Sequence, residues 1–182
     1  MDQASRAEDV SRSLRPPDER QAELERRLGA LGIGCATHAH APVFTVEEAQ
    51  ALRGALPGGH TKNLFLRDRG QTFWLVVLRE DLRVDLNGLA RTLGVSRFSF
   101  ATPGALEEKL GVPPGSVTPF ALINATTDQV RVILDEGLLD LDPLNFHPLR
   151  NDRTTAIATT DFLRFVRACG HEPLIMAIPQ RP

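Results

Sequence analysis

The sequence predicts one domain of the α+β class, in which strands pair locally and helices are interspersed between them. The clearest evidence is a hairpin, because apolar runs at 63–67 and 72–79 flank the turn residues Asp68-Arg69-Gly70. The second run is apolar at almost every position, which is typical of a central strand buried on both faces. The expected strands and helices do not alternate regularly, and no Gly-x-Gly-x-x-Gly motif follows a strand, so a Rossmann fold is not expected.

Start and stop signals predict five helices around these strands. Capping residues or prolines stand near the start of each helix, and a glycine follows each end. Leucines spaced three or four residues apart give the first helix an apolar stripe, Leu24-Leu28-Leu31. The expected helices begin near Asp18, Thr45, Asp85, Pro103 and Asp161, and they end before Gly32, Gly54, Gly94, Gly111 and Gly170.

Apolar and β-branched runs predict the remaining strands and extended stretches. These runs lie at 35–41, 120–124, 130–134, 143–149, 154–158 and 174–177. Residues 1–15 are polar and without periodicity, so we expect a disordered leader followed by a single domain over 16–182. No internal repeat and no linker divides the chain, and 182 residues suffice for one domain with a core.

The composition, 42% apolar and 24% charged, indicates an ordinary soluble globular protein. A net charge of −2 argues against a surface coated in positive charge, but it leaves room for a local patch that contacts RNA. No apolar run approaches the length of a membrane span and no signal-peptide segment opens the chain, so we expect a cytoplasmic protein without membrane contact. Cys35 and Cys169 are too few for a metal knuckle, and we expect two buried thiols.

Lysine is scarce, since only Lys62 and Lys109 interrupt a set of basic residues that are otherwise arginines. A lysine retained in such a chain is a candidate for a site that needs a compact ammonium, which the planar guanidinium cannot replace. Lys62 lies inside a motif, whereas Lys109 lies late in an expected helix. The arginines of the first helix and the hairpin are candidates for phosphate contact. They are Arg15, Arg20, Arg26, Arg27, Arg67, Arg69 and Arg79.

Three polar clusters stand out between the apolar segments, each at the edge of an expected strand or turn. They are Gly-His-Thr-Lys-Asn at 59–63, Gly-Ser-Val-Thr-Pro at 115–119 and Asn-Phe-His-Pro at 145–148. Together they offer a cation, a run of loop amides and an imidazole. That combination suits the binding and hydrolysis of an acyl ester.

These clusters resemble the prolyl-tRNA-synthetase-associated (YbaK-like) editing domains, and the likeness extends roughly from Asp18 to Ala177. Within that superfamily the chain is most similar to the free-standing deacylases of the ProXp-ala (PrdX) group, which remove alanine from proline tRNA. The resemblance implies a mixed, partly closed β-sheet flanked by helices. It also implies that the substrate is the acceptor end of an aminoacyl-tRNA, that no cofactor or metal is required, and that contact with prolyl-tRNA synthetase is transient.

The resemblance assigns the catalytic roles. Lys62 would hold a phosphate or polarise the ester carbonyl, and the backbone N–H groups of Gly115 and Ser116 would face the scissile ester. His147 would orient the terminal ribose or a water, with proton transfer as an alternative. Ser116 lacks the Gly-x-Ser-x-Gly setting of a nucleophile, so a covalent serine mechanism is not favoured.

A second set of residues is expected to bind the substrate. Asn63 would contact the ribose or the substrate amino group, and a structural turn role is the alternative; Phe44 would form a pocket wall or pack in the core. The full set is Phe44, His60, Asn63, Val117, Thr118, Pro119 and Asn145. His38 and His40 could chelate on one strand face, but no carboxylate or thiol cluster follows at metal spacing.

The leading functional hypothesis is a trans-acting deacylase for alanine mischarged on proline tRNA. Related free-standing domains remove cysteine, serine or threonine, and sequence does not reveal the pocket volume that separates them. Two other hypotheses are a catalytically silent module that binds tRNA or a protein partner and a hydrolase of a free small ester. Lys62, Gly115, Ser116 and His147 are all present, which counts against a decayed site.

Overall fold

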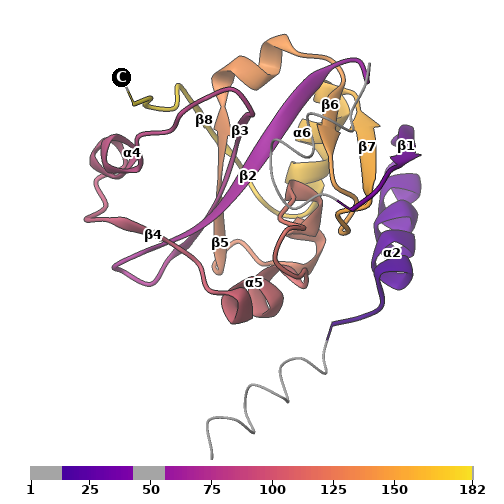
Figure 1. The fold of residues 1–182 in the computed structure, drawn as a ribbon, viewed down its shortest axis with the longest axis horizontal. Helices are drawn as coiled ribbons and strands as arrows, with labels where there is room; N and C mark the ends of the chain where they lie inside the picture. The colour runs from indigo at the N-terminus through magenta and orange to yellow at the C-terminus, as the bar shows by residue number, and fades with distance from the viewer. Residues whose placement is uncertain (1–13, 43–55, 182) are drawn as a thin grey trace, which may run out of the picture.

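The computed structural model describes residues 14–42 and 56–181, and it shows a mixed sheet with helices along its flanks (Figure 1). The helices are α2 (Pro17–Ala30), α4 (Leu86–Thr92), α5 (Pro103–Leu110) and α6 (Thr159–Ala168), with 3₁₀ turns η1 (Pro119–Asn124) and η2 (Glu136–Asp140). The strands are β1 (Cys35–Ala39), β2 (Gly59–Asp68), β3 (Phe73–Arg79), β4 (Phe98–Phe100), β5 (Val130–Asp135), β6 (Leu144–Phe146), β7 (Arg153–Ile157) and β8 (Leu174–Met176). The predicted α+β class with a mixed sheet is confirmed.

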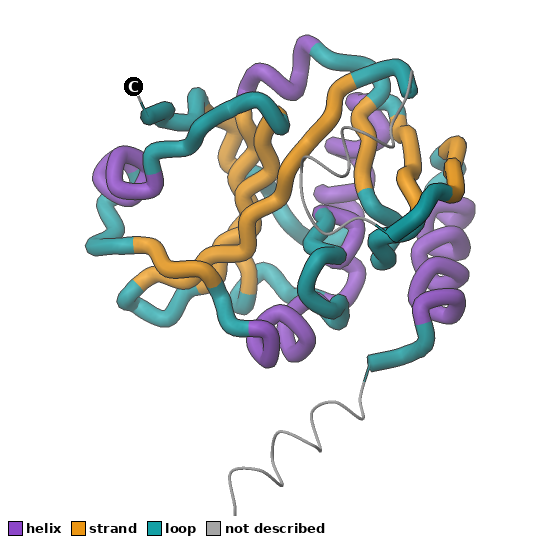
Figure 2. Tube along the Cα trace, viewed as in Figure 1, coloured by secondary structure: helices purple, strands orange, loops and turns teal. Residues whose placement is uncertain are grey.

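The strand order is β1-β7-β6-β2-β3-β5-β8, and β4 adds to β2 outside this path. β3 occupies one edge of β2 over its length, so β6 and β4 share the other edge. β6 pairs with β2 at Gly59 and His60, and β4 pairs with it at 66–68. The middle of that edge, residues 61–65, therefore has no strand partner in the described chain, and the sheet forks there (Figure 2).

The two faces of the central strands pack against separate apolar clusters. Phe65, Leu75 and Val77 belong to the larger one, whereas Leu66, Trp74 and other residues of the opposite parity belong to the second. Side chains alternate along a strand, so one run of apolar residues supplies both clusters. The prediction that β3 is central and buried on both faces is confirmed.

The segment 120–124 is a 3₁₀ turn, so the predicted strand there is wrong. The Thr118 hydroxyl accepts a hydrogen bond from the Phe120 amide, and Pro119 takes the first position, where a missing N–H costs nothing. A short apolar run buried on several sides carries no period that distinguishes a strand from a helical turn. β4 is only three residues long and was not predicted.

Several boundaries differ from expectation. β2 begins at Gly59, so the first polar cluster lies inside the strand. Asp18 does not cap α2, which has no side-chain cap; its carboxylate instead binds Arg150. The predicted N-cap of α4 at Asp85 and the predicted end of α5 at Gly111 are confirmed. The expected leader falls almost wholly, and the expected helix at Thr45 wholly, outside the described residues. No described helix is long and apolar enough to cross a bilayer.

Candidate functional site

Asn63 joins β2 to the loop at 115–119 across the fork in the sheet. Its side-chain Nδ2 donates a hydrogen bond to the Val117 carbonyl at 3.1 Å. Its Oδ1 is buried and has no hydrogen-bond partner within the described residues. Leaving a buried amide oxygen unmatched costs about 1–3 kcal/mol, so this atom retains the capacity to accept a hydrogen bond from a donor.

The loop that contacts Asn63 is held in one conformation by its own backbone. Gly115 has φ of +83°, a conformation that residues with a Cβ adopt only with strain. The Ser116 amide donates to the Pro113 carbonyl at 3.1 Å, and the Ser116 residue is 2% exposed. The loop thus carries main-chain polar groups beside Asn63, while the Ser116 side chain is buried.

Lys62 leaves β2 on the face opposite to Asn63, because adjacent strand residues point to opposite sides. Its ammonium donates to the Glu80 carbonyl at 3.0 Å and to the Leu82 carbonyl. Burial lowers the pKa of Lys62, an effect that the nearby carboxylates of Glu80 and Asp81 oppose. An ammonium has three N–H donors, so these two bonds fix its position and leave one donor for another acceptor.

Asn145 ties β6 to the start of β2. Its Nδ2 donates to the carbonyls of Pro57 at 3.0 Å and Gly59 at 3.3 Å, and the Thr61 hydroxyl donates to the Asn145 carbonyl at 2.9 Å. His60 donates from Nε2 to the Leu56 carbonyl at 3.2 Å. Asn145 is 5% exposed, and these bonds fix the backbone that precedes Lys62 and Asn63.

His147 lies in the turn after β6, and a backbone carbonyl fixes its ring. Nδ1 donates to the Arg153 carbonyl at 2.9 Å, since a carbonyl can only accept. The turn also contains Leu149 with φ of +63°, an uncommon conformation for a residue other than glycine. Such strain near a candidate site indicates that the surrounding structure holds the turn in place.

His40 is a neighbour of His147 that the sequence indicated only as a potential metal ligand. The two ring centroids lie 6.2 Å apart. His40 Nδ1 donates to the Ala41 carbonyl at 2.8 Å, and its Nε2 pairs with the Thr154 hydroxyl at 2.9 Å. The two histidines are 107 positions apart in the chain, so only the pairing of β1 and β7 brings them together.

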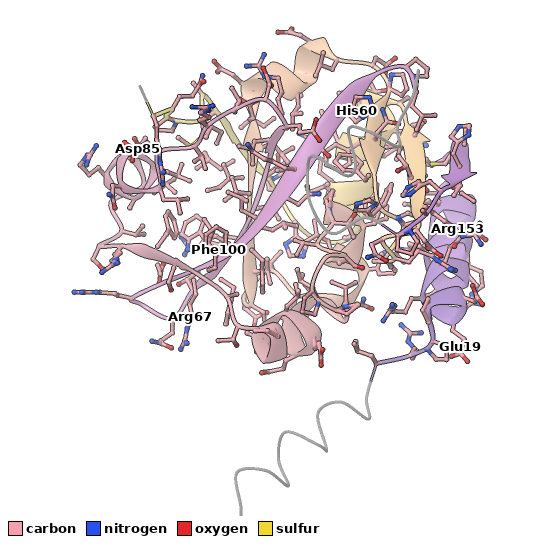
Figure 3. All side chains as sticks on the ribbon, in the orientation of Figure 1. Glu19, His60, Arg67, Asp85, Phe100 and Arg153 are labelled. Carbon is pink, nitrogen blue, oxygen red and sulfur yellow. The ribbon has the colours of Figure 1, made fainter. Side chains whose placement is uncertain are left out.

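The structure thus brings some of the expected residues together. Asn63 contacts the loop at 115–119 directly, and Asn145 supports the strand that carries Asn63; Figure 3 shows His60 at the start of this strand. The described contacts of the Lys62 ammonium lie instead in the connection after β3. Phe44 lies outside the described residues.

Neither cysteine belongs to this site. Cys35 is exposed on the edge strand β1, so the expectation of two buried thiols is wrong for this residue. Cys169 lines a cavity of about 380 Å³ with Arg15, Glu23 and Arg27, and burial raises its thiol pKa to about 11. In the part of the chain that the structure describes, no three His, Cys, Asp or Glu residues form a group that could hold a metal ion.

Comparison with known proteins gives consistent matches. Residues 40–165 match the model of the aminoacyl-tRNA editing domain family. A prolyl-tRNA synthetase associated domain-containing protein 1 from Mus musculus is 41% identical over 163 residues, which cover 87% of this chain and 96% of that protein. The prolyl-tRNA editing protein ProX of Acetoanaerobium sticklandii is 33% identical over 155 residues, covering 85% and 94%.

A solved structure has the same fold. It is described as a candidate trans-editing enzyme for prolyl tRNA synthetase, and it superimposes with a TM-score of 0.69 at 24% identity. The match covers 93% of this chain and all of the other chain, 100%. At this identity the likeness concerns the architecture alone.

Proposed function

This chain belongs to the aminoacyl-tRNA editing domain family, and we propose that it is a free-standing deacylase that hydrolyses the ester of alanine mischarged on proline tRNA. The family match supports the ester-hydrolase class. The finer assignment, alanine on proline tRNA, follows from the resemblance of the three polar clusters to the ProXp-ala group. A free-standing editing protein would act on released aminoacyl-tRNA, in the cytoplasm and with at most transient contact with the synthetase.

One observation carries the proposal: an unmatched amide oxygen lies beside a rigid run of main-chain groups. Asn63 Oδ1 is buried without a partner in the described chain, and Asn63 Nδ2 fixes the loop at Val117. The α-ammonium of an aminoacyl ester is a donor that matches this oxygen. With the ammonium bound there, the adjacent ester would face the loop at Gly115, whose amide would stabilise negative charge on the carbonyl oxygen. The Ser116 amide, also expected to face the ester, is instead bound to the Pro113 carbonyl at 3.1 Å.

The proposed reaction is direct hydrolysis. The oxygen of a water molecule adds to the acyl carbon, and the bond from that carbon to the ribose oxygen breaks. The ribose oxygen takes up a proton from the water and leaves as a hydroxyl group. His147, whose ring is fixed by the bond from Nδ1 to the Arg153 carbonyl, would orient the water or the neighbouring ribose hydroxyl. Lys62 lies on the opposite face of β2, where two carbonyls fix its ammonium, so its third N–H would be directed toward a phosphate and not toward an ester bound at Asn63.

Selectivity against the correct product would come from pocket size. A pocket that fits a methyl group rejects the pyrrolidine ring by steric clash, whereas a pocket sized for proline would admit alanine with only a modest loss of affinity. The prolyl ester would therefore survive.

A deacylation panel tests the proposal. Purified protein is incubated with alanyl-, prolyl-, cysteinyl-, seryl- and threonyl-tRNA, with and without a chelator. We expect Ala-tRNA(Pro) to be hydrolysed fastest, Pro-tRNA(Pro) to be spared, and the chelator to have no effect. Faster hydrolysis of another ester would reassign the specificity. Absence of hydrolysis on all five would contradict the enzyme assignment and favour a silent binding module.

A further inference from the structure

Three arginines lie at the far end of β2, and one of them, Arg67, shares the face that presents Asn63. Arg67 lies four residues after Asn63, so the two side chains point to the same side of the sheet. β4 pairs antiparallel with this end, with Arg67 opposite Ser99 and Asp68 opposite Phe98. Arg69 follows Asp68 in the hairpin turn and Arg97 directly precedes Phe98, so both lie at the same end of the sheet as Arg67. We name Arg67, Arg69 and Arg97 the arginine row.

Within the described part of the chain, no carboxylate forms an ion pair with the arginine row. None of the ion pairs among residues 14–42 and 56–181 includes any of its members, whereas other arginines, such as Arg150 with Asp152, are paired. The acid inside the hairpin, Asp68, is 7% exposed and is engaged elsewhere, because it accepts from the Trp74 indole at 2.9 Å and from the Thr72 amide at 3.0 Å.

Arg67 is held in place without an acidic partner. Its guanidinium carbon lies 5.7 Å from the centre of the Phe73 ring, and its Nε is buried with no hydrogen-bond acceptor in the described chain. Arg69 and Arg97 are both exposed. Cations close together without an acid repel one another, so an arrangement of three arginines suits a polyanionic partner.

The spacing relates the arginine row to the site. Four strand residues span about 13 Å, which places Arg67 within reach of the last nucleotides of an RNA whose 3′ end lies at Asn63. Figure 3 shows Arg67 towards the opposite end of β2 from His60. We propose that the arginine row binds the phosphodiester backbone of the substrate RNA next to its acylated end. This inference rests on the proposed deacylase function, and it adds the surface that guides the RNA.

Binding of an RNA without an acyl group separates this inference from the proposed function. A fluorescent hairpin with a single-stranded 3′ end is titrated with wild-type protein and with Arg69→Gln/Arg97→Gln, from low to moderate salt. We expect the double variant to bind about tenfold or more weakly. Its plot of log affinity against log salt should be shallower by roughly 0.7–0.9 for each phosphate that the variant no longer neutralises. Deacylation by the double variant should show a raised KM with little change in kcat.

The single variants Arg69→Gln and Arg97→Gln are compared with Arg131→Gln as the matched control, because each of the three removes one positive charge from the same end of the sheet. Arg131 pairs in register with Trp74, and its guanidinium lies over the Trp74 ring, on the face opposite to Arg67. Thermal unfolding checks that every variant is folded. Equal weakening by Arg131→Gln, or unchanged affinity in the double variant, would overturn the inference. Inorganic phosphate that stabilises the wild type as strongly as the RNA does would also overturn it, in favour of a small-anion site.

Discussion

The two faces of β2 differ in how their polar groups are matched. On one face Lys62 precedes Leu64 and Leu66, and its ammonium is bound to two backbone carbonyls of the same domain. On the other face Asn63 reaches across the fork in the sheet to Val117, and its Oδ1 has no partner in the described chain. Adjacent residues of one motif therefore occupy different environments.

This difference indicates where a substrate contact is expected. In a sequence, a charged residue is the obvious candidate for substrate binding. In the fold, however, two of the three N–H donors of Lys62 bind backbone carbonyls. The neutral side chain next to it has the unmet hydrogen-bonding capacity. Asn145 Oδ1 and Asp135 Oδ2 are also buried without a hydrogen-bond partner in the described chain. However, Asn63 Oδ1 is the one whose amide group contacts the 115–119 loop, so it is a more direct pointer to the reacting ester than the cation is.

The largest effect is expected from the loop that Asn63 contacts. Gly115→Val places a β-branched residue at φ of +83° and blocks the approach of the ester to the loop amides. We expect the deacylation rate to fall roughly 1000-fold or more in single-turnover assays. Ser116→Ala is the control, because it removes only a buried hydroxyl and should keep most of the rate. Comparable inactivity of Ser116→Ala and His147→Ala, or an alanyl adduct trapped on Ser116, would favour a Ser-His mechanism.

Lys62 tests the other face. Lys62→Ala should lower deacylation by about 100-fold, a transition-state loss of roughly 3 kcal/mol. It should also lower the melting temperature, because the carbonyls of Glu80 and Leu82 lose their donor. Lys62→Arg should remain poor, since the planar guanidinium does not fit the position of a compact ammonium. A lower melting temperature with a normal rate would make Lys62 purely structural.

A smaller effect is expected at the imidazole. His147→Ala should slow deacylation by about 10- to 1000-fold if the ring orients water or ribose without being the sole base. The pH–rate profile of the wild type supplies the check. If the deacylation rate of His147→Ala falls at acidic pH in the same way as the wild-type rate, another group is responsible for that pH dependence.

The smallest effect concerns the stability of the fold. Burial lowers the pKa of His171 from 6.5, although the Ala125 carbonyl opposes this shift. Below pH 6.5 the unfolded chain then binds a proton at His171 that the folded chain does not bind. The contribution of the neutral His171 to the free energy of unfolding should therefore be fully present above pH 6.5 and should decrease as the pH falls below it. His171→Gln should flatten this dependence in denaturant titrations. An unchanged slope would assign the acid sensitivity to other groups.

The sequence predicted those parts of the fold that have a local signal. The hairpin and the central position of β3 were evident from turn residues and an unbroken apolar run. The turn at 119–124 was not, because consecutive buried apolar residues have no helical or strand period. The short strand β4 is stabilised by pairing with β2, and no local sequence pattern indicates this contact.

The candidate site was predicted in its residue types and only partly in its arrangement. Asn63 and Val117 are 54 positions apart, and their hydrogen bond depends on how the loop docks against the fork in the sheet. The opposite facing of Lys62 and Asn63 follows from strand alternation, but only once β2 is known to begin at Gly59. The proximity of His40 to His147 requires the pairing of β1 with β7.

The central claim is that Asn63 Oδ1 accepts a hydrogen bond from the α-ammonium of the substrate. Propionyl-tRNA(Pro) carries only a hydrogen atom where alanyl-tRNA(Pro) carries the ammonium, so it has no donor there and the ratio of their kcat/KM values reports that contact. Hydrogen bonds to charged groups are worth about 1.5–3 kcal/mol, and Asn63→Ala should therefore reduce the preference for the alanyl ester by roughly 10- to 150-fold relative to wild type. An unchanged ratio in folded Asn63→Ala would contradict the account.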